Sequence, residues 1–214
     1  MNIIIIGAPG SGKGTQSQLI AKNYGIKHIC TSNLIRNYFK KKKKKSNFEK
    51  IIFSGKLLND EIVISFVKSR INKQDCKNGF ILDGFPRTYN QAIALKKLGI
   101  KFDYVIFLSL KDQIIIDRII YRRLHLPSGR IYNLKFNPPK VEGKDDITGD
   151  LLVNRKDDNK NILKNRLYEY HKNNNIILNF YYQQSLIGNN KYLIIDASKK
   201  KEEIIIDIIN KINI

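Results

Sequence analysis

Short, continuous runs of apolar residues alternate with longer amphipathic segments along the chain. Continuous apolar runs are typical of strands buried on both faces of a parallel sheet, because such strands have no polar face. The runs that predict strands are Asn2 to Ile6, Lys27 to Cys30, Phe80 to Leu82, Tyr104 to Leu108 and Tyr192 to Ile195. The segments that predict helices lie at about residues 13–24, 33–42, 48–54, 60–73, 89–98, 111–123, 156–187 and 201–212. This alternation predicts a three-layer α/β fold around a five-stranded parallel sheet.

Two segments interrupt the alternation of strands and helices. Residues 30–58 contain a helical insertion between strands, and residues 121–158 are polar, rich in proline and glycine, and too poor in apolar residues for a core. Alternating polar and apolar residues from Arg130 to Leu134 predict a small antiparallel ribbon in the second segment. A chain of 214 residues is long enough for one well-filled core. We therefore predict a single domain, 1–214, with a core of residues 1–29, 59–120 and 159–214, the insertion, and a small β flap of residues 121–158, called the lid.

A glycine-rich loop joins the first predicted strand to the first predicted helix. Residues 7–15 read Gly-Ala-Pro-Gly-Ser-Gly-Lys-Gly-Thr. Glycines allow the backbone N–H groups to approach phosphate oxygens, and the following helix directs the positive end of its dipole to the same anion. Lys13 adds a mobile positive charge. The loop therefore predicts nucleotide binding, although Gly14 stands where the general phosphate-loop pattern has Ser or Thr, and the hydroxyl follows at Thr15.

The chain is strongly basic, with a net charge of +20, and Lys40 to Lys45 form an unbroken run. Such a charge raises nucleic acid as a partner. However, 37 Ile, 30 Lys and 23 Asn are spread evenly along the sequence, and neither interleaved aromatic residues nor a basic reading helix accompanies them. We therefore expect no nucleic-acid partner. A nucleic-acid-binding protein with an incidental phosphate loop remains the alternative from another functional class.

Other sequence features favour a cytoplasmic protein with no membrane partner. Met1 leads directly into the first predicted strand, and no stretch of eighteen apolar residues follows. Cys30 and Cys76 lie far apart, so neither a disulfide framework nor a thiolate metal site is indicated.

Arginine is scarce in this lysine-rich chain, with nine residues in all. A guanidinium group binds phosphate through two parallel hydrogen bonds, which an ammonium group cannot reproduce. We therefore expect most of the arginines to converge on phosphates.

Three further segments, together with the glycine-rich loop, carry a resemblance to a known family. Asp83-Gly84-Phe85-Pro86-Arg87 is followed by Gln91, Arg118 to Arg123 carries three arginines, and Asn154 to Asp158 precedes a long predicted helix. With these segments the chain resembles the adenylate kinases over essentially its whole length, and Asn137 to Asp146 resembles the long lid of the bacterial type. The resemblance implies reversible phosphoryl transfer from Mg-bound ATP to AMP, giving two ADP. It also implies Mg²⁺ with ATP, a monomer, and AMP binding at the insertion.

The resemblance assigns roles residue by residue. The residues expected to be catalytic are Lys13, Asp83, Arg87, Arg122, Arg155 and Arg166. Those expected to bind ATP are Gly10, Ser11, Gly12, Lys13, Gly14, Thr15, Arg118, Arg122, Ile131, Tyr132 and Lys199. Those expected to bind AMP are Thr31, Arg36, Lys56, Leu57, Leu58, Gly84, Phe85, Pro86, Arg87, Gln91, Arg155 and Arg166.

Two of these expectations compete with structural roles. Asp83 is expected to orient water on Mg²⁺, or alternatively to cap the turn that follows its strand. Leu57 and Leu58, taken alone, are more typical of core packing than of a binding site.

The predicted AMP site departs from the family pattern at residues 31–33. Thr31-Ser32-Asn33 stands where Thr-Gly-Asp is usual. We expect Ser32 and Asn33 to cap the following helix, so that the fold is retained. Another nucleoside monophosphate kinase, acting on UMP, CMP or GMP, is the nearest alternative function.

The lid poses a separate question about zinc. Some members of the family hold zinc there on four cysteines, and the matching positions in this chain are His125, Ser128, Asp145 and Thr148. Two hydroxyls and one carboxylate are a poor tetrahedral zinc set. We therefore expect no zinc and a hydrogen-bonded cluster of these four side chains.

Overall fold

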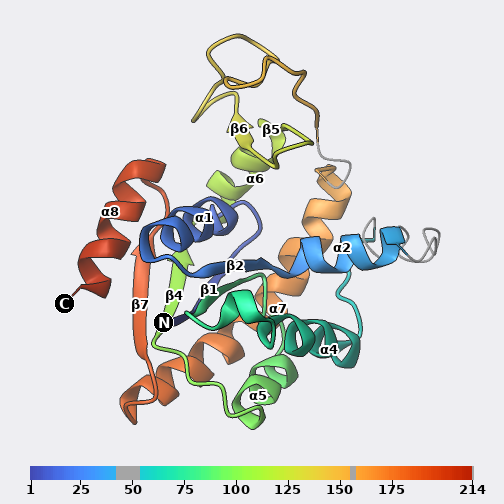
Figure 1. Ribbon diagram of the computed structural model, residues 1–214. Helices are drawn as coiled ribbons and strands as arrows, with labels where there is room; N and C mark the ends of the chain where they lie inside the picture. The colour runs from blue at the N-terminus through green and yellow to red at the C-terminus, as the bar shows by residue number, and fades with distance from the viewer. Residues whose placement is uncertain (42–53, 155–157, 214) are drawn as a thin grey trace.

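A computed structural model of the chain describes residues 1–41, 54–154 and 158–213. At its centre is a parallel sheet in the order β2-β3-β1-β4-β7 (Figure 1). This arrangement confirms the predicted α/β fold, and the ends of each predicted strand differ by at most one residue from those observed. The strands are β1 (Asn2–Gly7), β2 (Lys27–Cys30), β3 (Phe80–Asp83), β4 (Tyr104–Ser109) and β7 (Lys191–Asp196).

The central strand β1 is apolar throughout because both faces of the sheet are covered. Successive side chains of a strand point to opposite faces. Ile4 and Ile6 pack with side chains from helices α4, α5 and α7, whereas Ile3 and Ile5 pack with side chains from α1 and α8. Figure 1 shows these helices on the two sides of the sheet. The helices are α1 (Lys13–Tyr24), α2 (Thr31–Lys41), α4 (Asp60–Ile71), α5 (Tyr89–Lys97), α6 (Asp112–Ile120), α7 (Lys160–Leu186) and α8 (Lys201–Ile212), with a 3₁₀ turn η1 at Gln74–Cys76.

Side-chain caps explain where three of these helices begin. Asn59, Thr88 and Asn159 each accept a hydrogen bond from a backbone N–H in the first turn of α4, α5 and α7. A cap of this kind satisfies one of the N–H groups that a helix leaves without an internal partner. The caps of α4 and α5 also fix the chain near residues expected to bind AMP.

The predicted helix over residues 111–123 is wrong at its C-terminal end. Helix α6 ends at Ile120, and β5 (Arg122–Leu124) pairs antiparallel with β6 (Ile131–Asn133). Leu124 also exchanges two backbone hydrogen bonds with Val153. These cross-chain bonds replace those that a longer helix would make, and they place Arg122 on the lid ribbon that stands above α6 in Figure 1.

Two predicted helix starts also need correction. Helix α2 begins at Thr31, directly after β2, so Ser32 and Asn33 lie in its first turn and do not cap it. Helix α7 begins at Lys160, later than predicted, because Asn159 caps it. The predicted helix at residues 48–54 lies almost wholly outside the described residues, as do Lys42 to Lys45. No described helix is long and apolar enough to span a bilayer.

Candidate active site

The glycine-rich loop joins the carboxyl end of β1 to the first turn of α1. Gly12 precedes α1 with φ +92°, a left-handed conformation that L side chains rarely adopt. At Gly7, an added Cβ would lie 2.7 Å from Ser11 Oγ and 2.9 Å from the carbonyl oxygen of Leu108. The loop therefore depends on glycine at both ends, and its backbone lies at the N-terminus of a helix, where anions bind.

The amine of Lys13 is buried beneath this loop. Its Nζ donates hydrogen bonds to the carbonyl oxygens of Gly7 at 2.6 Å and Ala8 at 2.7 Å. Burial lowers the pKa of Lys13 to about 7; the carboxylate of Asp83 opposes this shift, and the cations of Arg87, Arg166 and Arg122 add to it. These arginines come from the loop after β3, from α7 and from β5. Several cations around one buried amine make a site that favours a polyanion.

Asp83 supplies the negative charge beside this cluster. It ends β3, is 7 % exposed, and lies 3.2 Å from Nε2 of His28 on β2. Burial raises the pKa of Asp83, but the hydrogen bond from His28 and the charge of Lys13 outweigh it, so the net pKa lies below its usual value. An ionised oxygen donor in this position is the type of group that holds the water shell of Mg²⁺. The chemistry of Asp83 therefore fits its predicted role.

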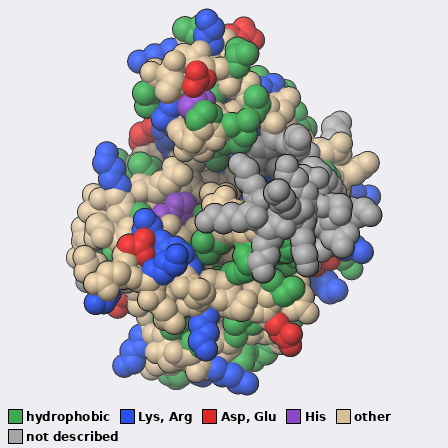
Figure 2. All heavy atoms as spheres, turned by 45° about the vertical axis from the view of Figure 1, so that its right-hand side comes forward, with side chains coloured by type: hydrophobic (Ala, Val, Ile, Leu, Met, Phe, Trp, Pro, Cys, Tyr) green, Lys and Arg blue, Asp and Glu red, His purple; other side chains and the backbone are tan. Residues whose placement is uncertain are grey.

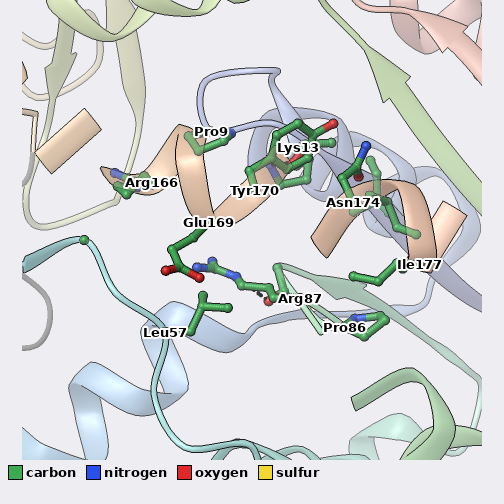
Figure 3. A pocket seen from close by; sticks show the side chains of 15 residues that line it. Pro9, Lys13, Leu57, Pro86, Arg87, Arg166, Glu169, Tyr170, Asn174 and Ile177 are labelled. Atoms are coloured by element: carbon green, nitrogen blue, oxygen red, sulfur yellow. Dashed lines mark hydrogen bonds between the residues drawn. The ribbon is translucent and has the colours of Figure 1, made fainter. Parts of the chain in front are cut away.

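A pocket with about 640 Å³ of empty space, partly open to solvent, lies next to Lys13. Six of the residues predicted for the site line it: Lys13, Leu57, Gly84, Pro86, Arg87 and Arg166. In Figure 3 the carboxylate of Glu169 and the guanidinium group of Arg87 point toward each other.

A stripe of residues on α7 that line the pocket was not predicted from the sequence. Together with Arg166 this stripe comprises Glu169, Tyr170, Asn174 and Ile177. Their spacing of three to four residues places them on one face of the helix. That spacing was available from the sequence once Arg166 had been assigned.

Arg87 is held in place by its neighbours on the predicted AMP side. Its Nε donates to the carbonyl oxygen of Gly84 at 2.8 Å, and its Nη2 donates to Ser32 Oγ at 3.2 Å. Its backbone N–H donates to Gln91 Oε1 at 2.7 Å. The buried hydroxyl of Thr31 has no hydrogen-bond partner in the part of the chain that the structure describes. The contact of Ser32 with Arg87 is specific to this chain's departure from the usual Thr-Gly-Asp sequence.

Sequence similarity to known proteins identifies the family. The sequence profile of the adenylate kinase family matches residues 5–186. The chain belongs to the adenylate kinase family. It is 52 % identical to the adenylate kinase of Sodalis glossinidius over 173 residues, which cover 80 % of this chain and 81 % of that protein. The adenylate kinases of Photorhabdus laumondii and Francisella philomiragia are 53 % and 51 % identical, over 80 % of this chain and 81 % and 80 % of their own lengths.

The other residues expected at the AMP side of an adenylate kinase are divided between core and surface. Phe85 is fully buried, and Leu58 packs against the same apolar cluster. Lys56 is exposed, and Arg36 on α2 is near enough for its charge to act on the thiol of Cys30. Burial raises the pKa of that thiol. Phe85 and Leu58 therefore support the site through packing.

The residues expected at the ATP side of an adenylate kinase lie above and beside the loop. Arg118 on α6 donates to the carbonyl oxygens of Ser198 and Lys199, both at 3.4 Å. Burial lowers the pKa of Arg118, and Asp196 opposes that change. Two hydrogen bonds join Arg122 to Asp158, one of them from Nε at 2.7 Å.

The remaining expected residues of the ATP side are in the loop and the lid. Gly10, Ser11, Gly14 and Thr15 belong to the loop or the first turn of α1. Ile131 is 40 % exposed on the lid ribbon, whereas Tyr132 is buried and donates to Asp145. Arg155 lies outside the described residues.

The lid brings His125, Ser128, Asp145 and Thr148 together. Ser128 Oγ is 2.6 Å from Nδ1 of His125, and Thr148 Oγ1 is 3.1 Å from an oxygen of Asp145. Two further members of the cluster were not predicted. The Nε and Nη2 of Arg130 donate to the Asp145 carboxylate at 2.8 and 2.5 Å, and Asp150 is 2.9 Å from Nε2 of His125. Among the described residues, no group of three or more His, Cys, Asp or Glu side chains is placed to hold a metal ion.

Asp145 is the centre of this lid cluster. Besides Arg130, Tyr132 and Thr148, it accepts hydrogen bonds from the backbone N–H groups of Ile147 and Thr148. The hydrogen bonds from Arg130 hold the pKa of Asp145 far below its usual value, against the effect of burial. An ionised carboxylate with this many donors links the two halves of the lid.

Basic side chains are dispersed over the face of the molecule that Figure 2 shows. Figure 2 shows Lys and Arg scattered over one face of the molecule and interspersed with acidic side chains. This distribution is what the even spread of lysine along the sequence predicts.

Proposed function

We propose that this protein transfers the terminal phosphoryl group of Mg-bound ATP reversibly to AMP, giving two ADP. The observation that carries the proposal is the pocket that Lys13, Arg87 and Arg166 line together. The charge of Arg122, on the lid ribbon, also acts on the amine of Lys13. Two nucleotides with facing phosphates present many oxygens at one place, and guanidinium groups bind such oxygens in pairs. Membership of the adenylate kinase family supports the same reaction.

The proposed mechanism relies on positioning and charge neutralisation. The transferred group passes in line between two oxygens, so the protein needs to align the reactants and stabilise negative charge. Lys13 would leave the carbonyl oxygens of Gly7 and Ala8 and bind phosphate oxygens. Arg87 and Arg36 would hold the phosphate of AMP, while Arg122, Arg155 and Arg166 would bind the transferring group. No general base is needed, because the AMP phosphate is already an anionic nucleophile.

Mg²⁺ bound with ATP would neutralise part of the phosphate charge during transfer. Asp83 is the residue of this chain that would hold its water molecules. The hydrogen bond from His28 keeps one oxygen of Asp83 oriented, and Lys13 lies close to the same carboxylate. The hydroxyl of Thr15, in the first turn of α1, is a further oxygen donor of the loop.

We also propose that the chain works as three parts. Residues 1–29, 59–120 and 159–214 form the core, residues 30–58 bind AMP, and residues 121–158 close over ATP. Closure would exclude water, which would otherwise accept the phosphoryl group; the adenylate kinase lid is a known example of such closure. The lid has its own two-stranded sheet, separate from the central sheet, and this supports the division.

An assay with four acceptors tests the proposed substrate. ADP formation from ATP is measured with AMP, UMP, CMP and GMP under the same conditions. AMP should be preferred, and a rate with AMP no higher than that with UMP or CMP would contradict the proposal. Salt-sensitive oligonucleotide binding that survives excess ATP would instead support a nucleic-acid-binding protein.

Two adjacent arginines of the lid test the proposed site. The probe is a bisubstrate compound that joins two adenosines through five phosphates. Arg122→Ala should weaken its binding and lower kcat by about 10²-fold or more. Arg123→Ala is the matched control, because Arg123 donates to the backbone oxygens of Ile120 and Arg122 and lies outside the proposed site. Equal effects of both substitutions would argue against the site.

The predicted absence of zinc and the predicted monomeric state need separate measurements. Protein purified without chelators should contain far less than one equivalent of zinc, and EDTA should leave Tm unchanged. One equivalent of zinc would overturn the interpretation of the lid cluster.

Light scattering during size-exclusion chromatography should give the mass of one chain. Cell fractionation tests the predicted cytoplasmic location.

A further inference from the structure

A carboxylate outside the predicted site contacts Gln91, one of the residues expected to bind AMP. Asp60 is the first residue of α4, and Gln91 lies in the first turn of α5. The two helices lie side by side in Figure 1. Gln91 Nε2 donates to Asp60 Oδ1 at 2.7 Å, and Gln91 Oε1 accepts from the backbone N–H of Arg87 at 2.7 Å. Gln91 is 2 % exposed, so both contacts are shielded from water.

These two contacts allow only one orientation of the Gln91 amide. A carboxylate can only accept a hydrogen bond, and a backbone N–H can only donate one. If the amide were turned by 180°, its oxygen would face the carboxylate and its NH₂ group would face the N–H of Arg87. Both contacts would then be repulsive, so Asp60 and Arg87 together fix which end of the amide is nitrogen.

The second oxygen of Asp60 is fixed in the same way. Thr88 Oγ1 donates to Asp60 Oδ2 at 2.8 Å and accepts the backbone N–H of Gln91 at 3.2 Å. Since Thr88 accepts from Gln91, its own hydrogen points to Asp60. The carboxylate also lies at the N-termini of α4 and α5, where negative charge is favoured. Asp60, Thr88 and Gln91 therefore form a closed set of hydrogen bonds with one direction.

An amide fixed in this way retains one N–H hydrogen and one oxygen lone pair for a ligand. Adenine offers an amino donor next to a ring-nitrogen acceptor, which complements such a pair. Hypoxanthine has a carbonyl acceptor in place of the amino donor. It would meet the oxygen of the fixed amide with another oxygen, and an amide free to turn would lose this discrimination.

We propose that Asp60 is a positioning residue for base recognition, which holds the Gln91 amide in the orientation that selects a 6-amino over a 6-oxo purine monophosphate. The inference rests on the proposed function, because it assigns the monophosphate site to the pocket lined by Arg87, whose backbone N–H donates to Gln91. Asp60 itself does not touch the substrate in this account. Its effect passes entirely through Gln91.

The test compares kcat/KM for AMP with kcat/KM for IMP in the full chain. Asp60→Ala should lower the AMP:IMP ratio by about tenfold, the effect of one directed hydrogen bond. Glu61→Ala is the matched control, because Glu61 is the next residue of the same helix turn and its exposed carboxylate can be removed without touching Gln91. It should leave the ratio unchanged.

A double-mutant cycle separates positioning from general damage. In a Gln91→Ala background, Asp60→Ala should change the AMP:IMP ratio no further. Two outcomes would overturn the inference. One is an AMP:IMP ratio in Asp60→Ala that lies within twofold of the wild-type ratio. The other is a fall of the AMP:IMP ratio on Asp60→Ala that is equally large in the wild-type and Gln91→Ala backgrounds. If Asp60→Ala does not fold, Asp60→Leu decides, because leucine has a shape similar to aspartate and no acceptor for Gln91 Nε2. An unchanged ratio in that variant would also overturn the inference. A wild-type protein that does not phosphorylate AMP would instead refute the proposed function.

Discussion

In the lid, the carboxylate of Asp145 accepts hydrogen bonds from Arg130, Tyr132 and Thr148, whereas the phosphate loop leaves its buried polar groups with few partners. Ser11 Oγ has no hydrogen-bond partner within the described residues. Among the residues that the structure describes, the amine of Lys13 donates to two backbone carbonyl oxygens. The lid satisfies its buried polar groups internally, whereas the phosphate loop does not.

This difference separates a structural polar cluster from a binding site. An unpartnered buried polar atom costs stability, while a fully connected network is rigid and specific. Cations gathered around Lys13 add to the cost in the free protein, and a bound polyanion would reverse the sign of that interaction. The same residue types therefore indicate different roles according to whether the surrounding protein has already satisfied them.

The largest expected effect comes from removing the amine of the phosphate loop. Lys13→Met should reduce kcat for ADP formation on the order of 10³-fold, because a buried cation next to the transferring phosphoryl group is lost. Lys22→Met is a suitable control, since Lys22 is an exposed lysine in the last turn of the same helix. Similar losses in both variants would show that the effect is general to α1.

Removing the Asp145 carboxylate should lower the stability of the lid without affecting the central sheet. Asp145→Ala leaves Arg130, Tyr132 and two backbone N–H groups without their acceptor, so amides of residues 124–153 should exchange about tenfold faster with solvent. Amides of β1 and β4 should keep their exchange rates. Glu142→Ala removes an exposed lid carboxylate and should change neither set. Unchanged lid exchange in Asp145→Ala would mean that the cluster contributes little.

The lowered pKa of Lys13 predicts a difference in stability that depends on pH. The pKa of Lys13 is about 7 in the folded chain, and its ordinary value is 10.5. Between pH 7 and pH 10.5 the unfolded chain therefore holds a proton that the folded chain lacks. Stability contributed by this group therefore rises with pH in that window and is lowest below pH 7. The Tm of the wild type minus that of Lys13→Met should increase by several degrees between pH 6.5 and pH 9. A constant difference would contradict the pKa.

The smallest expected effect concerns the residue that departs from the family pattern. Ser32→Gly removes the hydroxyl that accepts from Arg87, so KM for AMP should rise about threefold at unchanged kcat. Ser32→Ala removes the same hydroxyl without adding backbone freedom and should match it. A fall in KM would instead show that Ser32 competes with the AMP phosphate for Arg87.

The fold could be predicted where the pattern of apolar residues is long and has one interpretation. Ile3 to Ile6 could only form a strand buried on both faces, and Lys201–Ile212 has a helical period from end to end. The change from helix α6 to strand β5 at Tyr121 could not be predicted from the sequence. A three-residue strand such as Arg122–Leu124 depends on its distant partner Ile131–Asn133.

The site could be predicted where residues are adjacent in sequence, as in the phosphate loop and at Asp83 to Arg87. Partners brought together only by folding were missed, among them His28 with Asp83 and Asp60 with Gln91. The bond of Arg130 to Asp145 was also missed, because it depends on the path of the lid. No local pattern gives the direction of these side chains.

Helix α7 shows how this chain accommodates its unusual composition. The face with Arg166 and Asn174 lines the pocket, while Lys164, Lys172 and Asn179 are exposed. Lysine side chains can therefore be accommodated on the outer face without reaching the pocket. The helix thus carries positions that tolerate substitution a single turn away from positions that shape the pocket, so a comparison of its two faces among variants would separate solubility from function.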